Sequence, residues 1–64
     1  MSEKIVTGYS ELRILFKEIG IKFTDSGPAE DNLGEQVYID IADAAIILFF
    51  DIDAEGNETF VCQE

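Results

Sequence analysis

Hydrophobic positions follow a helical period near the start of this 64-residue chain and a strand period over its second half. Between 9 and 19 the large apolar residues recur every three or four positions, which predicts an amphipathic helix. Thr7 or Ser10 would cap its start, and Gly20 suits the left-handed residue that ends a helix. The apolar stripe of this helix consists of Tyr9, Leu12, Leu15, Phe16 and Ile19.

Shorter runs with alternating apolar residues predict strands. The first strand is expected over 21–24, the second over 37–41 and the third over 46–52. A fourth strand over 58–62 would follow a tight turn at 53–56, in which Gly56 takes the left-handed conformation.

The segments between these elements differ in character. Residues 1–6 are expected to form a loose lead-in, in which Ile5 and Val6 could add a short edge strand. Residues 25–35 are rich in acids and turn-forming residues, which predicts a long acidic loop between the first two strands.

The four-residue connection over 42–45 fixes the pairing that keeps the apolar residues of neighbouring strands on one face. The expected architecture is therefore a single α+β domain over 1–64, with one N-terminal helix packed on a three- to four-stranded antiparallel sheet. The helix would cover Ile39, Leu48, Phe50 and Phe60. The expected cross-strand pairs are Ile41 with Ile46, Ile39 with Leu48, Val37 with Phe50, Phe60 with Phe50, and Cys62 with Leu48.

The opposite face of the sheet would also be apolar at its centre. Two arrangements account for this: the face binds a partner or a second copy, or the sheet curls so that the N-terminal segment and the long loop cover it. The second is favoured in so small a domain. The residues of this face are Tyr38, Ile47, Phe49 and Val61, with Asp40 and Asp51 beside them.

The charge is strongly negative and unevenly distributed. The net charge is −10, all four basic residues lie in the first 22 positions, and eleven acids follow from Phe23 onward. Such a chain repels nucleic acid, anionic membranes and acidic proteins, and it attracts basic surfaces. Because no segment resembles a signal peptide or a membrane span, we expect a soluble cytoplasmic protein. The single cysteine, Cys62, agrees with a reducing compartment.

No motif in the sequence indicates catalysis or a cofactor. The chain has no histidine, and Cys62 has no second cysteine, so it is expected to be a small core residue. Acid-base chemistry by paired carboxylates needs a pocket that raises one pKa, for which this domain has little room. We therefore expect neither enzymatic activity nor a bound cofactor.

The run Asp51-Ile52-Asp53-Ala54-Glu55-Gly56 matches the opening of a calcium loop. The rest of that pattern is missing, because Glu58 and Cys62 stand where an aliphatic residue and a glutamate belong. A hairpin turn explains the same letters, and calcium binding stays an alternative.

The most distinctive candidate site is the array of carboxylates itself. Residues on one face of a strand lie about 6.6–6.8 Å apart, and DNA presents a phosphate about every 3.4 Å of axis on each strand. A rigid sheet with dense carboxylates could therefore occupy a basic groove meant for nucleic acid. The alternative is an acidic surface that serves only solubility. The candidate partner-binding residues are Glu30, Asp31, Asp40, Asp43, Asp51, Asp53, Glu55 and Glu58.

Size, acidity and the order of helix then sheet give this chain a resemblance over its whole length to small phage-encoded inhibitors of bacterial defence. It is similar in build to anti-CRISPR proteins of the DNA-mimic type that inhibit type I Cascade complexes. The resemblance implies binding to a Cas protein surface that takes duplex DNA near the protospacer-adjacent motif, with a bacterial host cell as the compartment. A homodimeric module that pairs through Tyr38, Ile47 and Phe49 is the rival hypothesis, although a monomer is favoured.

Overall fold

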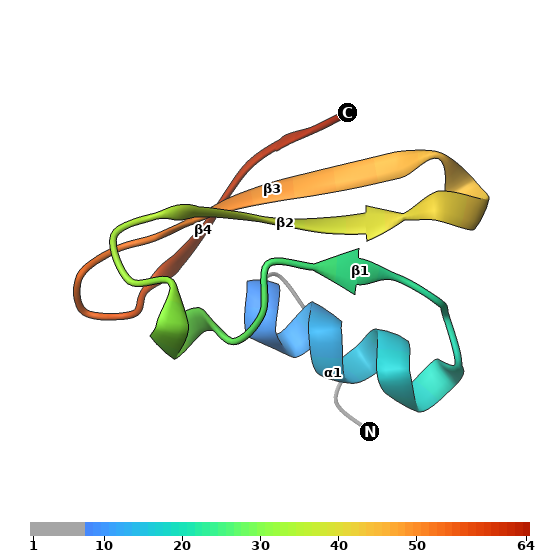
Figure 1. The fold of residues 1–64 in the computed structure, drawn as a ribbon, viewed down its shortest axis with the longest axis horizontal. Coiled ribbons are helices and arrows are strands. Elements are labelled where there is room, and N and C mark those ends of the chain that lie inside the picture. Colours follow the sequence, from blue (N-terminus) through green and yellow to red (C-terminus); the bar gives the residue numbers. More distant parts are fainter. Residues whose placement is uncertain (1–7) are drawn as a thin grey trace, which may run out of the picture.

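The computed structural model describes residues 8–64, which form one helix against a four-stranded antiparallel sheet (Figure 1). This confirms the predicted α+β architecture. The strand order is β1-β2-β3-β4, so each strand lies beside its neighbours in sequence. The elements are α1 (Tyr9–Ile19), β1 (Thr24–Asp25), the 3-10 turn η1 (Ala29–Asp31), β2 (Gln36–Ile41), the 3-10 turn η2 (Ala42–Ala44), β3 (Ile46–Ile52) and β4 (Glu58–Gln63).

Helix α1 spans the predicted residues, but its start is not capped as expected. The N-cap is Gly8, which has no side chain to accept a hydrogen bond, whereas Ser10 lies inside the first turn. The predicted cap at Ser10 is therefore wrong, and Thr7 lies outside the described residues together with 1–6. At the other end Gly20 takes a φ of 80°, as predicted, and its N–H donates to Phe16. No helix within 8–64 is long and apolar enough to cross a membrane.

The first strand is shorter and later than predicted. Only Thr24 and Asp25 pair with β2, opposite Asp40 and Ile39. Residues 21–23 form instead the connection between α1 and β1, and the N–H of Ile21 donates to the Phe16 carbonyl at the helix end. The Phe23 ring packs edge-on against Phe16, at 5.7 Å between centroids, so part of its apolar surface is buried against the helix.

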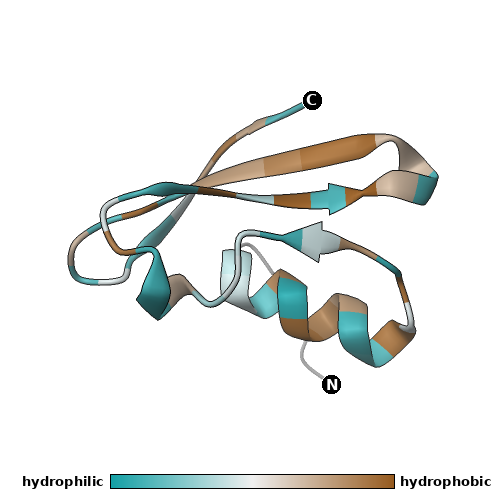
Figure 2. Ribbon diagram, in the orientation of Figure 1, coloured by the Kyte–Doolittle hydropathy of each residue, from teal (hydrophilic) through white to brown (hydrophobic). Residues whose placement is uncertain are grey.

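The hydrophobic core lies between α1 and the face of β2 and β3 that carries the predicted apolar set. The register of these two strands is as predicted, with Val37 opposite Phe50 and Ile39 opposite Leu48. Tyr9 of α1 packs its ring on Phe50 at 5.7 Å. Figure 2 shows the run of hydrophobic residues along β3. The buried hydrophobic residues are Tyr9, Ala29, Val37, Ile39, Phe50 and Ile52.

A bulge in β4 changes the pairing predicted for the end of the chain. Phe60 lies opposite Phe50 as expected, but Cys62 lies opposite Phe49 rather than Leu48. Val61 is the extra residue at this register shift. One inserted residue moves every later side chain to the other face of a strand. The prediction that Cys62 belongs to the core under α1 is therefore wrong. Cys62 lies on the opposite face of the sheet, beside Phe49.

The long loop does not cover that opposite face. Its Ala29 is buried in the core on the helix side, and the Asn32 amide donates to the carbonyls of Ser26 and Pro28, which closes the loop on itself. The prediction that this loop covers the opposite face of the sheet is wrong, because burial of Ala29 in the core holds the loop on the same side of the sheet as α1. The other predicted cover, the N-terminal segment, lies outside the described residues.

Candidate functional site

At one end of the sheet, η1 and the turn between β3 and β4 lie near each other (Figure 1), and both segments carry acidic residues. The chain before β2 is attached to the end of β3, because the Gly34 N–H donates to Ile52 and the Ile52 N–H donates to Glu35. An open hollow of about 340 Å³ lies between these segments, and Glu35, Asp51 and Asp53 contribute to its lining. We call this group the acidic end; it consists of Glu30, Asp31, Glu35, Asp51, Asp53 and Glu55.

Asp53 holds the turn at this end in shape. One carboxylate oxygen accepts hydrogen bonds from the N–H groups of Glu55 and Asn57, and the other accepts one from the Asn57 amide. The bonds from Asn57 keep the pKa of Asp53 below its ordinary value, so this carboxylate is charged at neutral pH. Gly56 has a φ of 89°, which confirms the predicted left-handed residue.

The same hairpin turn accounts for the residues at 51–56 that match the opening of a calcium loop. Both carboxylate oxygens of Asp53 are used by the turn, and β3 and β4 flank it as strands. Across residues 8–64 there is no group of three acidic, histidine or cysteine side chains placed to hold a metal ion. The geometry therefore supports the hairpin interpretation of this run.

Glu58 has a different role from the other predicted binding residues. Its carboxylate accepts a hydrogen bond from the Ser10 N–H at 3.1 Å and a second from the Ser10 hydroxyl. Two free donors of the first helical turn are thereby satisfied by a residue of β4. A β-carbon on Gly8 would lie 2.7 Å from one Glu58 oxygen. Glu58 thus supplies from the sheet the acceptor that the N-cap Gly8 lacks, and its negative charge also favours the helix dipole.

The remaining two predicted residues lie away from the acidic end. Asp43 belongs to η2, in the connection at the other end of β2 and β3. Asp40 lies within β2, opposite Ile47 of β3 and Thr24 of β1. The structure thus brings five of the eight candidates together and separates Asp40, Asp43 and Glu58 from them.

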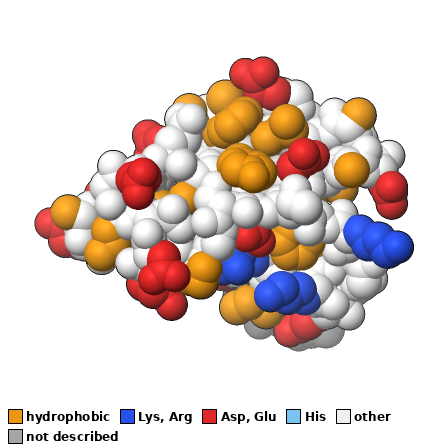
Figure 3. Space-filling view, viewed as in Figure 1, with side chains coloured by type: hydrophobic (Ala, Val, Ile, Leu, Met, Phe, Trp, Pro, Cys, Tyr) orange, Lys and Arg blue, Asp and Glu red, His pale blue; other side chains and the backbone are white. Residues whose placement is uncertain are grey.

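The face of the sheet opposite α1, which we call the open face, has an ordered pattern. Residues paired across strands share a face, so the pairing defines three rows that run across β2, β3 and β4. Glu64 takes its place beside Ile47 through two backbone hydrogen bonds of 2.8 Å. Apolar side chains are exposed over the sheet, with carboxylates beside them (Figure 3). The rows are Gln36-Asp51-Thr59, Tyr38-Phe49-Cys62 and Asp40-Ile47-Glu64.

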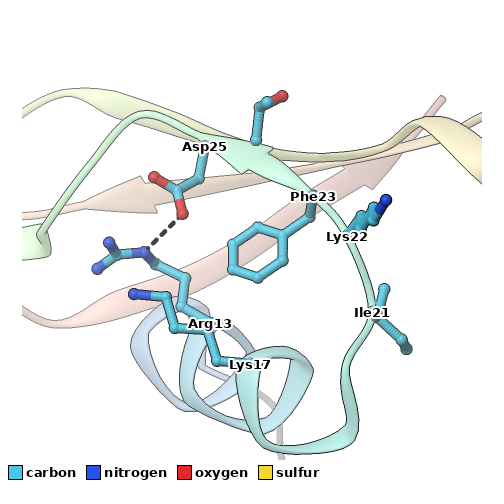
Figure 4. A pocket seen from close by; sticks show the side chains of 7 residues that line it. Arg13, Lys17, Ile21, Lys22, Phe23 and Asp25 are labelled. Atoms are coloured by element: carbon cyan, nitrogen blue, oxygen red, sulfur yellow. Dashed lines mark hydrogen bonds and ion pairs between the residues drawn. The ribbon is translucent and has the colours of Figure 1, made fainter.

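The described basic residues belong to α1 and to the chain that leads into β1, and none of them lines the hollow at the acidic end. Arg13, Lys17 and Lys22 surround an open hollow of about 560 Å³ between α1 and β1 (Figure 4). Arg13 donates from Nε to Asp25 at 2.8 Å, and the Gly27 N–H donates to the other oxygen of Asp25. Lys17 and Lys22 are exposed. The cations are therefore grouped around this hollow and leave the acidic end without a positive charge from the described residues.

Burial and hydrogen bonds shift two pKa values beside this hollow. Burial alone would raise the pKa of Asp25, but the bonds from Arg13 and Gly27 hold it below its ordinary value. Burial and the negative charge of Asp25 raise the pKa of Tyr9, whose hydroxyl donates to the Gly27 carbonyl at 2.6 Å. Both groups tie α1 to the chain around β1.

Glu35 and Glu64 belong to these surfaces but are not among the eight candidate binding residues predicted from the sequence. Glu35 directly precedes Gln36, which pairs with Asp51, so the predicted register already placed it near the acidic end. Glu64 depends on the bulge at Val61, for which the sequence gives no signal.

No protein-family model, curated protein or solved structure matches this chain. The resemblance to anti-CRISPR proteins therefore stays a prediction.

Proposed function

We propose that this protein is an acidic inhibitor that occupies a basic groove in which a nucleic-acid-binding complex holds DNA. The observation that carries the proposal is the separation of charge. Six acids lie at one end of the sheet, and the described basic residues gather around the hollow beside α1. A net charge of −10 spread evenly over the surface would favour solubility, but it would not orient the protein toward a basic partner.

The separated charge supports a binding mechanism based on electrostatic steering. A basic groove attracts the acidic end more strongly than the side that carries Arg13, Lys17 and Lys22, so the protein arrives mainly in one orientation. The tip that carries Glu55 is rigid because Asp53 and Asn57 fix it, which limits the entropy lost on docking. Once bound, the protein excludes DNA by occupying its site.

The partner class follows from the resemblance. A Cas protein surface that takes duplex DNA near the protospacer-adjacent motif combines a basic groove with a bacterial cytoplasmic location. In this proposal the protein acts by binding alone, without catalysis, a cofactor or direct contact with nucleic acid.

Competition with DNA on a purified type I Cascade complex tests the proposal. A labelled duplex that carries the protospacer-adjacent motif is mixed with the complex and increasing amounts of the protein, and bound duplex is measured by mobility shift. We expect loss of bound duplex, with an inhibition constant that weakens steeply as salt rises, since the Debye length shortens to about 8 Å at 0.15 M. Full duplex binding at every concentration and at low salt would refute inhibition of Cascade.

A further inference from the structure

The open face of the sheet has the composition of a protein-binding site. Its central row, Tyr38-Phe49-Cys62, places two aromatic rings and a thiol side by side across three strands. Tyr38 is 38% exposed although it stands in the middle of β2. Asp51 lies in the row on one side, and Asp40 and Glu64 lie in the row on the other. Aromatic centres surrounded by polar residues are the usual form of a binding hot spot.

We propose that the open face binds a basic protein surface that carries apolar side chains between its Lys and Arg residues. Tyr38 and Phe49 are the apolar anchor, and Asp40, Asp51 and Glu64 pair with the partner's cations. This inference rests on the proposed function in taking the partner to be basic. It adds that the contact is not purely electrostatic and that it extends from the acidic end onto the sheet.

Charge decides between the possible occupants of this face. A second copy related by a two-fold axis would bring Asp40, Asp51 and Glu64 against the same residues of its neighbour. Each copy also carries a net charge of −10, so the pair would be repelled at long range as well. A nucleic acid or an acidic peptide meets the same repulsion. A basic surface with apolar side chains is the occupant that satisfies both the rings and the carboxylates.

Two short peptides of equal length and charge test the proposal without reference to any natural partner. One alternates Lys with Leu and the other alternates Lys with Ser. Titrated into isotope-labelled protein, the Lys/Leu peptide should bind about tenfold or more tightly than the Lys/Ser peptide. Its amide shift changes should concentrate on 36–40, 47–51 and 59–64. Equal affinity for the two peptides, or shifts confined to α1 or to the acidic end alone, would overturn the proposal.

Substitutions test whether peptide binding depends on Tyr38 and Phe49 or on any exposed apolar side chain. Tyr38→Thr and Phe49→Thr keep a residue type suited to strands and should each reduce affinity for the Lys/Leu peptide about tenfold. Ile14→Gln is the matched control, because Ile14 is 59% exposed on α1 and its loss should leave affinity unchanged. If Phe49→Thr fails to fold, Tyr38→Thr decides alone. Equal losses in the control and the anchor variants contradict the proposal.

Two further results distinguish the failure of this inference from the failure of the proposed function. If Cascade is inhibited and Tyr38→Thr inhibits as well as the wild type, the open face is not the contact surface although the proposed function holds. If Cascade is unaffected but the peptide results are as expected, the proposed function fails and the open face remains a site for a basic partner. Sedimentation that shows a dimer abolished by Tyr38→Thr would assign the face to a second copy and overturn the proposal.

Discussion

Glu58 of β4 receives hydrogen bonds from both the backbone N–H and the hydroxyl of Ser10, the second residue of α1. The two residues are 48 positions apart in the chain. The start of the helix is therefore tied to the last strand of the sheet.

Replacing Glu58 should destabilise the fold. Glu58→Ala removes the acceptor for two donors of the first turn, and we expect the free energy of unfolding to fall by about 1–2 kcal/mol, as for loss of an ordinary N-cap. Urea denaturation followed by circular dichroism measures this loss. Glu55→Ala is the control, since Glu55 is exposed at the hairpin tip. An equal effect of the two substitutions would show that the cap does not stabilise the helix.

Gly8 should be coupled to Glu58. The β-carbon of Gly8→Ala would approach one Glu58 oxygen to 2.7 Å, so the carboxylate has to move away from Ser10. We expect Gly8→Ala to cost about 1 kcal/mol or more and the double variant with Glu58→Ala to cost clearly less than the two single changes added together. A double-mutant cycle of unfolding free energies measures this coupling. Strict additivity would mean that Gly8 is not required to make room for the carboxylate.

The pair Arg13 and Asp25 should make stability sensitive to acid. The pKa of Asp25 in the folded protein lies below its ordinary value of 3.8. A lowered carboxyl pKa stabilises the fold above the unfolded-state pKa, and this stabilisation is lost as the pH falls through the folded-state pKa. We expect Asp25→Asn to cost about 1–2 kcal/mol at pH 7, and the difference from wild type to shrink as the pH falls below about 5.

The difference between the two proteins is the quantity to measure, because acid also neutralises the other carboxylates. In a chain of net charge −10 this relief of repulsion stabilises the fold and opposes the loss at Asp25. Thermal unfolding of wild type, Asp25→Asn and the control Asp43→Asn over this pH range separates the two effects. If the stability gap between wild type and Asp25→Asn stays constant with pH, Asp25 does not have a lowered pKa.

The fold was largely predictable from the sequence because the hydrophobic period is strong in α1, β2 and β3 and the four-residue connection fixes one register. Two effects of tertiary structure could not be predicted from the sequence pattern. Ile21 donates to the end of α1, which keeps 21–23 out of the sheet although they alternate like a strand. The bulge at Val61 does not change the pattern of apolar residues in the sequence. It places Cys62 and Glu64 on the open face.

The candidate site was predictable only as a composition. The list of acids could not distinguish Glu58, which is used by the helix, from Glu55, which is free at the turn. That distinction depends on a contact between Ser10 and β4 across most of the chain. Glu35, in contrast, could have been added from the pairing of its neighbour Gln36 with Asp51.

Inhibition should depend on the position of the charges and not on their number. Two variants of equal net charge test it: Glu35→Gln with Glu55→Gln at the acidic end, and Glu18→Gln with Asp43→Asn elsewhere on the exposed surface. Both raise the net charge from −10 to about −8 at pH 7. In competition with labelled duplex for Cascade, the first variant should need about tenfold more protein for half inhibition, and the second should inhibit like wild type. Equal inhibition by the two variants would contradict the account.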